Sequence, residues 1–249
     1  MKPFHFKKFS IEQDQCAMKV TFDACLFGAL CASELNDDSK DHIALDIGSG
    51  TGLLSLMLAQ KGLKHVYGVE LDHAAAQQSQ NNVLNSPYSN KITITEGNIE
   101  DYRHHEKFNL IVSNPPFFSQ HLKGPNHQRN QARHNDGLSF KTLIFYIQQN
   151  LAINGFAWLL LPCDEYERFK EQLKSAKLSI HNIHKVRSRE DKAPHRVMFS
   201  LTHCDNKSRL DMGESNLKIE TYTIHQSIDD QSVYSQKVQN LLRDYYLKL

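Results

Sequence analysis

The feature that most constrains this chain is a glycine-rich turn between a short apolar strand and an apolar helix. Residues 43–47, IALDI, have the pattern of a buried strand and lead directly into the turn GSGTG at residues 48–52. An apolar stretch over residues 53–60 follows at once and is expected to be a helix. Strand, glycine turn and helix in direct succession are typical of an open α/β sheet, in which ligands bind at the carboxyl ends of the strands.

The chain downstream of this turn continues to alternate between strands and helices. The pattern predicts strands over residues 66–69, 91–95, 108–113 and 156–161, and helices over residues 74–84, 138–151 and 165–176. Two further strands, 178–186 and 196–201, follow each other without a helix, which indicates an antiparallel pair. We therefore expect an α/β, Rossmann-like fold with a mostly parallel seven-stranded sheet, an antiparallel edge and helices on both faces.

The composition is that of an ordinary globular domain. The 249 residues carry a net charge of +1 and 40% of them are hydrophobic, which argues against disorder and against a bulk-basic nucleic-acid binder. We expect one domain, with an amino-terminal extension at 1–40, a core sheet at 42–203, and a carboxyl-terminal strand and helix at 204–249.

The polar amino terminus has no signal-peptide core, and no apolar run approaches the ~20 residues that span a bilayer. We expect a cytoplasmic protein with no membrane partner.

Neither the cysteines nor the histidines predict a metal site. The five cysteines are odd in number and contain no CxxC pair, which favours reduced thiols over disulfides or zinc. The 14 histidines include no HExxH motif, so we expect no bound metal.

The glycine turn allows three ligand hypotheses beside a turn that binds nothing. A phosphate-binding P-loop needs a Gly-Lys-Ser/Thr ending, which is absent here, and the spacing GxGxG differs from the dinucleotide fingerprint GxGxxG. The stretch DIGSGTG at residues 46–52 does resemble the D/E-x-G-x-G-x-G loop with which class I methyltransferases bind S-adenosylmethionine. The cofactor contacts expected of this turn are Asp46, Gly48, Ser49, Gly50, Thr51 and Gly52.

Residues after the next two strands complete the expected cofactor site. Glu70 ends the second strand, where a carboxylate can accept hydrogen bonds from both ribose hydroxyls of a nucleoside, and Leu71 would face the adenine. Asn98 follows the third strand at a position where methyltransferases more often have aspartate. Its amide oxygen can accept a hydrogen bond from the adenine amine, or Ile99 can offer its backbone N–H.

The candidate catalytic motif is Asn114-Pro115-Pro116-Phe117, directly after the fourth strand. Two prolines fix an extended turn, so the Asn114 side-chain oxygen and the Pro115 carbonyl form a pair of acceptors for a planar amine. Phe117 can stack on the ring that carries this amine. A plain strand-ending turn is the alternative, and the glycine turn upstream favours the catalytic interpretation.

The two motifs together resemble the class I methyltransferases that methylate amino groups in adenine, guanine or glutamine. The segment MKVTFDACLFG at residues 18–28, the carboxyl-terminal residues 234–247 and the Pro-x-Arg at residues 194–196 resemble the bacterial tRNA valine adenine-N6-methyltransferases. The resemblance covers essentially the whole chain. It implies S-adenosylmethionine as cofactor, tRNA as partner and the adenosine directly 3′ of the anticodon as target. It also implies that the amino-terminal segment lies over the cofactor, with contacts from Lys19, Thr21 and Asp23.

Basic residues suggest where RNA would bind. No acidic residue occurs between 118 and 134, directly after the catalytic motif, and a second basic set follows residue 184. Positive charge there suits the phosphates that flank a flipped nucleotide, while a solvated loop or hairpin is the alternative for each set. The expected RNA contacts are Lys123, Arg129, Arg133, Lys185, Arg187, Arg189 and Arg196.

Other functions remain open at this point. A glutamine-N5 methyltransferase usually has a helical amino-terminal domain and NPPY, and a guanine-N2 rRNA enzyme often has a duplicated domain. An RNA-binding module without catalysis is an alternative from another class, against which the intact NPPF argues.

Overall fold

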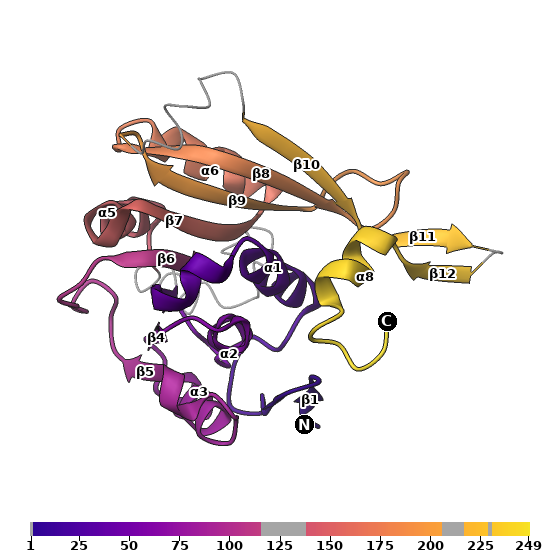
Figure 1. Ribbon diagram of the computed structural model, residues 1–249. Coiled ribbons are helices and arrows are strands. Elements are labelled where there is room, and N and C mark those ends of the chain that lie inside the picture. Colours follow the sequence, from indigo (N-terminus) through magenta and orange to yellow (C-terminus); the bar gives the residue numbers. More distant parts are fainter. Residues whose placement is uncertain (1, 116–137, 206–216, 229–230) are drawn as a thin grey trace, which may run out of the picture.

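An eight-stranded mixed sheet forms the centre of the protein (Figure 1). The computed structural model describes residues 2–115, 138–205, 217–228 and 231–249. The sheet has the strand order β10-β8-β9-β7-β6-β3-β4-β5. Its strands are β3 (Ile43–Ile47), β4 (His65–Glu70), β5 (Ile92–Glu96), β6 (Phe108–Ser113), β7 (Leu151–Pro162), β8 (Leu178–Arg187), β9 (Arg196–His203) and β10 (Lys218–Thr223).

The sheet confirms the Rossmann-like expectation and corrects it in two details. Strands β5, β4, β3, β6 and β7 are parallel, whereas β9 is antiparallel to both β7 and β8. Strand β10 then adds an eighth strand, parallel to β8, where seven were expected. The antiparallel strand therefore lies inside the sheet rather than at its edge, because the β8–β9 hairpin inserts β9 next to β7.

Helices cover both faces of this sheet. The helices are α1 (Phe22–Ser33), α2 (Leu53–Lys61), α3 (His73–Leu84), α5 (Phe140–Asn150), α6 (Cys163–Leu173) and α8 (Gln236–Leu242), with 3-10 turns at Asp37–Asp41 and Ser89–Lys91. One core contains α1, α2 and α8 and the other contains α5 and α6. Every residue of β3 is buried, with Ala44 in the first core and Leu45 in the second, as expected of a strand covered on both faces.

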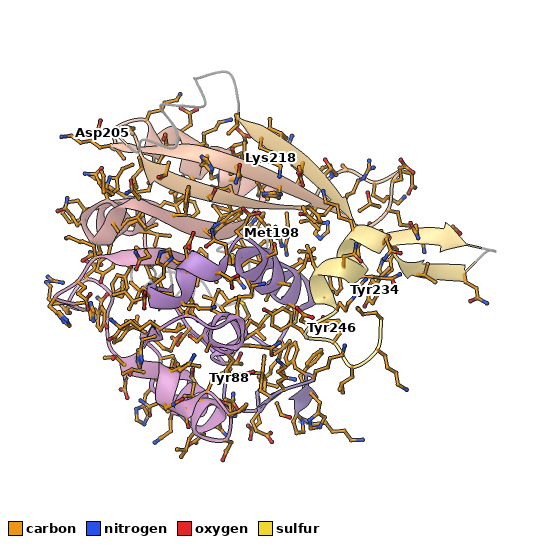
Figure 2. All side chains as sticks on the ribbon, in the orientation of Figure 1. Tyr88, Met198, Asp205, Lys218, Tyr234 and Tyr246 are labelled. Carbon is orange, nitrogen blue, oxygen red and sulfur yellow. The ribbon has the colours of Figure 1, made fainter. Side chains whose placement is uncertain are left out.

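The two ends of the chain pack against each other beside α1 and α2 (Figure 1). The short strands β1 (Phe4–His5) and β2 (Ser10–Ile11) form a hairpin, and the Lys7 N–H donates a hydrogen bond to the Tyr245 carbonyl oxygen. A second hairpin, β11 (His225–Ile228) with β12 (Gln231–Tyr234), precedes α8. Tyr234 stacks on Phe22 of α1, with ring centroids 5.2 Å apart, and Tyr246 lies nearby (Figure 2). The carboxyl-terminal part thus contains a hairpin besides the expected strand and helix.

Strand register brings the predicted motifs to one edge of the sheet. Ile47 at the end of β3 pairs with Val69 of β4 and with Ser113 of β6, and Glu70 pairs with Glu96 of β5. The residues that follow these strands therefore meet at the carboxyl edge, where open α/β sheets bind their ligands. Among the described residues, no helix is both long enough and apolar enough to cross a membrane.

Candidate functional site

The glycine turn after β3 is held open by left-handed backbone conformations. Gly48, Gly50 and Gly52 have φ angles of 73°, 53° and 79°, a region that side-chain-bearing residues rarely adopt. The Gly48 N–H donates to the Val69 carbonyl oxygen at 2.8 Å, which fastens the turn to the end of β4. A β-carbon at Gly52 would lie 2.6 Å from the Ser79 Oγ, so α3 also approaches the turn closely. A β-carbon at Gly48 or Gly50 would meet no atom within 4 Å, so this part of the turn is open to a ligand at its backbone.

Glu70 is fixed by two backbone N–H groups. Its Oε2 accepts a hydrogen bond from the Gly50 N–H at 2.8 Å, and its Oε1 accepts one from the Asp72 N–H at 3.0 Å. A carboxylate has about four acceptor sites, so each oxygen keeps capacity for a hydroxyl donor. The adjacent Leu71 has 58% of its surface exposed and presents an apolar face next to this carboxylate. The arrangement suits a ribose with an attached base.

Asp46 lies inside the protein beneath the surface of the turn and supports the turn through hydrogen bonds to α2. It is fully buried, and its Oδ2 accepts hydrogen bonds from the Ser55 N–H at 3.1 Å and the Ser55 Oγ at 2.7 Å. Ser55 lies in the first turn of α2, so Asp46 satisfies a helix donor that Gly52 has no side chain to cap. Burial raises the pKa of Asp46 to about 7.

The loop after β5 brings Asn98 and Ile99 to the same edge. The Gly97 N–H donates to the Glu70 carbonyl oxygen at 2.8 Å, which places this loop beside Glu70. The Asn98 Oδ1 accepts a hydrogen bond from the Glu100 N–H at 3.0 Å, so one of its lone pairs serves the loop itself. Asn98 is exposed, and the Ile99 side chain is buried in the core.

Asn114 presents a buried amide oxygen that no described residue satisfies. The Ser113 Oγ donates to the Ile47 carbonyl oxygen at 2.9 Å, which ties the end of β6 to the start of the glycine turn. The Asn114 Oδ1 next to it is buried and has no hydrogen-bond partner in the part of the chain that the structure describes. A lone buried acceptor costs about 1–3 kcal/mol, and a ligand that donates a hydrogen bond to it would remove this cost. Pro115 is buried, whereas Pro116 and Phe117 lie outside the described residues.

The residues that were expected to reach the cofactor from the amino-terminal segment contact protein groups. The Lys19 Nζ donates to the carbonyl oxygens of Gln13 and Cys16, each at 2.6 Å. The Thr21 Oγ1 caps α1 by accepting from the N–H of its third residue, Ala24, at 3.2 Å. Lys19 and Thr21 therefore shape the segment that leads into α1.

Asp23 is paired with two residues at the start of β9, His195 directly before the strand and Arg196 at its first position. Its carboxylate lies 3.2 Å from the Arg196 Nε and 3.4 Å from the His195 Nε2. A cofactor residue and an RNA residue expected from the sequence are thus paired with each other. Arg187 is similarly engaged, donating from Nε to the Thr223 Oγ1 at 2.9 Å and from its guanidinium to the Glu190 carbonyl oxygen at 2.8 Å.

Five other basic residues were expected to contact RNA, and two of them lie in the part of the chain that the structure describes. Lys185 and Arg189 are exposed on and beside the β8–β9 hairpin. Lys123, Arg129 and Arg133 lie outside the described residues.

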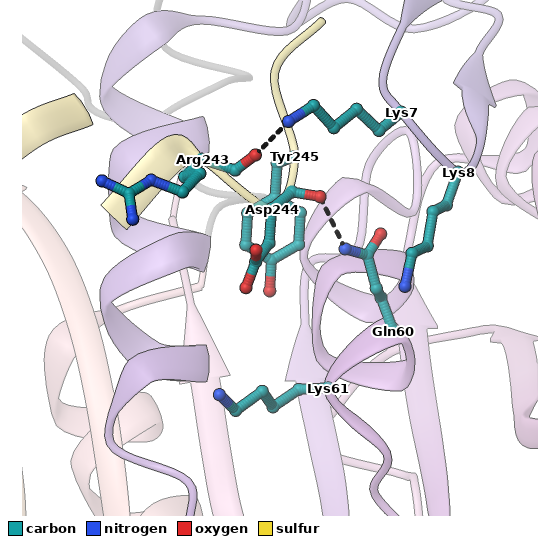
Figure 3. A pocket seen from close by; sticks show the side chains of 7 residues that line it. All are labelled: Lys7, Lys8, Gln60, Lys61, Arg243, Asp244 and Tyr245. Atoms are coloured by element: carbon teal, nitrogen blue, oxygen red, sulfur yellow. Dashed lines mark hydrogen bonds between the residues drawn. The ribbon is translucent and has the colours of Figure 1, made fainter. Parts of the chain in front are cut away.

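A basic pocket lies away from this edge (Figure 3). It forms between the amino-terminal lysines, the end of α2 and the carboxyl-terminal segment. Because α2 begins at the glycine turn and ends at Lys61, the pocket lies at the opposite end of that helix. Its lining residues are Lys7, Lys8, Gln60, Lys61, Arg243, Asp244 and Tyr245.

Two buried carboxamides near the turn were not predicted from the sequence. Gln78 and Asn82 lie one helical turn apart on α3, 6% and 2% exposed, and both bind the amino-terminal segment. The signal available in the sequence was weak, since polar residues in a helix are usually solvated.

The chain has sequence relatives over nearly its whole length. A family model described as the methyltransferase small domain matches residues 28–131. A tRNA1(Val) (adenine(37)-N6)-methyltransferase of Shewanella baltica is 37% identical over 249 residues, covering 98% of this chain and 99% of the relative. A protein of the same name from Bacteroides fragilis is 36% identical over 252 residues, covering 99% and 98%.

Solved structures share the fold at low sequence identity. A "predicted O-methyltransferase" from Agrobacterium tumefaciens superposes with a TM-score of 0.63 at 16% identity, covering 90% of this chain and 96% of the other. A glycopeptide N-methyltransferase in complex with S-adenosylmethionine has a TM-score of 0.52 at 11% identity, with coverage of 72% and 93%. These neighbours show that the fold is that of S-adenosylmethionine-dependent methyltransferases, and the sequence relatives show that the chain belongs to the tRNA1(Val) (adenine(37)-N6)-methyltransferase family.

Proposed function

We propose that this protein transfers the methyl group of S-adenosylmethionine to N6 of the adenosine at position 37 of tRNA1(Val). The observation that carries the proposal is the buried Asn114 Oδ1, which lacks a partner among the described residues and lies at the same sheet edge as the glycine turn. An exocyclic adenine amine is a donor that would satisfy it. The relatives' names supply the tRNA and the position of the nucleotide.

The residues at the carboxyl edge fit the cofactor. The open part of the turn at Gly48 and Gly50 lets a ligand approach the backbone, and Glu70 is held with acceptor capacity for the ribose hydroxyls. In this proposal Leu71 covers the adenine, while Asn98 and Ile99 contact its edge. The bound cofactor supplies an electrophilic methyl group. Asp46 acts through Ser55 by holding the first turn of α2.

The chain's own contribution to the chemistry is positioning and electrostatics. The lone pair of the adenine amine is delocalised into the ring, which makes the amine a poor nucleophile. Two acceptors, the Asn114 Oδ1 and the Pro115 carbonyl oxygen, would bind its two protons and favour a nitrogen with an available lone pair. Pro116 completes the turn, and Phe117 would stack on the flipped base.

The RNA would approach the same edge from its basic margins. Lys185 and Arg189 are exposed, and Lys123, Arg129 and Arg133 follow the catalytic motif in the sequence. We assign phosphate contacts to these five residues. Arg187 and Arg196 belong to the same surface in the proposal, but each is also engaged with protein groups. A cytoplasmic location, without metal or membrane partner, is part of the proposal.

The decisive experiment supplies one methyl donor and several acceptors. The purified protein is incubated with tritiated S-adenosylmethionine and, separately, with unmodified tRNA1(Val), ribosomal RNA, duplex DNA and a release factor. We expect label in the tRNA alone, and N6-methyladenosine as the product in nucleoside mass spectrometry. A tRNA1(Val) with guanosine at position 37 is the matched control and should stay unlabelled. Label in the release factor but not in tRNA would refute the proposal and favour glutamine methylation.

A further inference from the structure

The amino-terminal segment at residues 12–20, here called the strap, is fastened to the glycine turn by one side chain. The Asn82 Oδ1 accepts a hydrogen bond from the Glu12 N–H at 2.9 Å, and its Nδ2 donates to the Glu12 carbonyl oxygen at 2.8 Å. The same Nδ2 donates to the Thr51 carbonyl oxygen at 2.9 Å. With 2% of its surface exposed, Asn82 has all of these bonds inside the protein. One carboxamide therefore joins the strap, α3 and the turn.

Gln78 holds the next part of the strap in the same manner. Its Oε1 accepts from the N–H groups of Gln15 and Cys16 at 2.8 and 3.1 Å, and its Nε2 donates to the Asp14 Oδ1 at 2.5 Å. Because Gln78 and Asn82 are four residues apart, they lie on one face of α3. The face of α3 that contacts the strap therefore carries two carboxamides. They bind peptide groups of the strap and the Asp14 carboxylate.

The strap is also held together by hydrogen bonds between its own residues. The Lys19 ammonium donates to the carbonyl oxygens of Gln13 and Cys16, and the Gln13 Oε1 accepts from the Val20 N–H at 2.8 Å. These bonds fix the strap's shape before it enters α1. The strap is a folded element with its own internal contacts, and α3 determines where it is placed.

The strap lies along α3, the helix whose N-cap, Asp72, comes two residues after Glu70. Cys16 is 3% exposed, and burial together with the negative charge of Glu70 raises the pKa of its thiol to about 11. The Asn82 bond to Thr51 connects the strap to the glycine turn itself. The strap is therefore joined through α3 to the turn, which is one part of the cofactor site.

We infer that Asn82 is a positioning residue for the cofactor. Its side chain fixes the position of the strap relative to the glycine turn, so that the strap and the turn form the cofactor site together. The identity of the cofactor rests on the proposed function. Asn82 does not need to touch the cofactor in this role. It acts through Thr51 on one side and Glu12 on the other, and its loss would leave both carbonyl oxygens without a donor.

The test replaces Asn82 by the isosteric leucine and measures cofactor binding directly. Calorimetry with S-adenosylhomocysteine should show a dissociation constant raised about tenfold in Asn82→Leu. In methyl transfer, the KM for S-adenosylmethionine should rise by a similar factor, while kcat at saturating cofactor and the KM for tRNA stay within twofold of wild type. An unchanged dissociation constant would overturn the inference.

A matched control separates this role from general destabilisation. Asn109 uses its Oδ1 to accept from the Ile43 N–H at 3.0 Å, at the opposite end of β3, so Asn109→Leu removes a comparable bond far from the turn. We expect both variants to lower the melting temperature and only Asn82→Leu to weaken cofactor binding. Equal weakening in both variants would refute the inference.

A second variant covers the case in which Asn82→Leu does not fold. Gln78→Met preserves the side-chain length and removes the bonds to Gln15, Cys16 and Asp14. It should raise the dissociation constant in the same direction, and an unchanged value would count against the strap as part of the site. Because cofactor binding is measured without RNA, failure here is distinct from failure of the proposed function, which is decided by whether wild-type protein methylates tRNA.

Discussion

The Glu70 carboxylate accepts a hydrogen bond from the Gly50 N–H at 2.8 Å, which ties the end of β4 to the centre of the turn after β3. Gly50 has a φ of 53°, so its N–H direction depends on a backbone conformation that glycine adopts readily. The two motifs that the sequence places 20 residues apart are therefore one structural unit. Glu70 therefore shapes the turn, and it lies at the carboxyl edge of the sheet, where open α/β sheets bind their ligands.

Replacing Glu70 should weaken cofactor binding, and the loss should be larger when both carboxylate oxygens are removed than when one is kept. Glu70→Ala removes a charged acceptor and its bonds to Gly50 and Asp72, so the dissociation constant of S-adenosylhomocysteine should rise about 10–100-fold. Glu70→Gln keeps one acceptor oxygen and should give an intermediate value. Calorimetry measures both, with circular dichroism as the control for folding. Unchanged affinity in Glu70→Ala would remove Glu70 from the site.

Asn114→Ala should separate activity from stability. Its Oδ1 has no partner among the described residues, so truncation removes a costly buried acceptor and should leave the melting temperature unchanged or slightly raised. Methyl transfer should fall about 100–1,000-fold in kcat, because the acceptor for the amine is lost, while cofactor affinity stays within twofold. Single-turnover transfer to tRNA and thermal unfolding are the measurements. Substantial turnover in this variant would refute the catalytic assignment.

The parts of the fold that were predictable are those encoded locally. Strand β3, its glycine turn and helix α2 follow from an apolar run, three glycines and a second apolar run, and the carboxyl edge places Glu70 and Asn114 together without further information. The position of β9 between β7 and β8, and the addition of β10, depend on pairings between distant strands. Hydrophobic periodicity identifies such strands but does not order them.

The parts of the site that were not predictable depend on partners far apart in sequence. Asp23 and Arg196 form an ion pair, although each was assigned to a different ligand from the sequence. Asn82 binds Glu12 and Thr51 across 70 and 31 residues, and nothing in a helical polar residue reveals such partners. The roles of all these residues toward cofactor and RNA stay predictions.

The pairing of Arg196 with Asp23 predicts that the basic residues of the hairpin region differ in function. Arg196→Gln should lower the free energy of unfolding by about 1 kcal/mol, since the pair is largely shielded from solvent, with 29% and 19% side-chain exposure. Arg189→Gln should leave stability unchanged and reduce the slope of log K for tRNA against log salt by about 1. Urea unfolding and tRNA binding at several salt concentrations test both.

A matched control for these hairpin variants lies on another element. Arg168 of α6 pairs with Glu165 at 2.9 Å, so Arg168→Gln removes a cation and an ion pair away from the hairpin. Its salt slope for tRNA should equal that of wild type. If Arg196→Gln lowered the slope as much as Arg189→Gln while leaving stability intact, the structural role of the Asp23 pair would be wrong.

Asp46 should make stability fall as pH rises through the acid range. Burial raises the pKa of this carboxyl to about 7, from an ordinary value of 3.8. Between about pH 4 and pH 7 the folded protein therefore retains a proton that the unfolded chain has lost, and the free energy of unfolding decreases with increasing pH. Asp46→Asn mimics the neutral carboxyl and cannot titrate, so its stability relative to wild type should increase by about 2–4 kcal/mol between pH 4 and pH 7.5. Urea unfolding at several pH values measures this difference, with Asp101→Asn as the control for the removal of an exposed carboxylate. A curve for Asp46→Asn parallel to that of wild type would show that Asp46 ionises equally in both states.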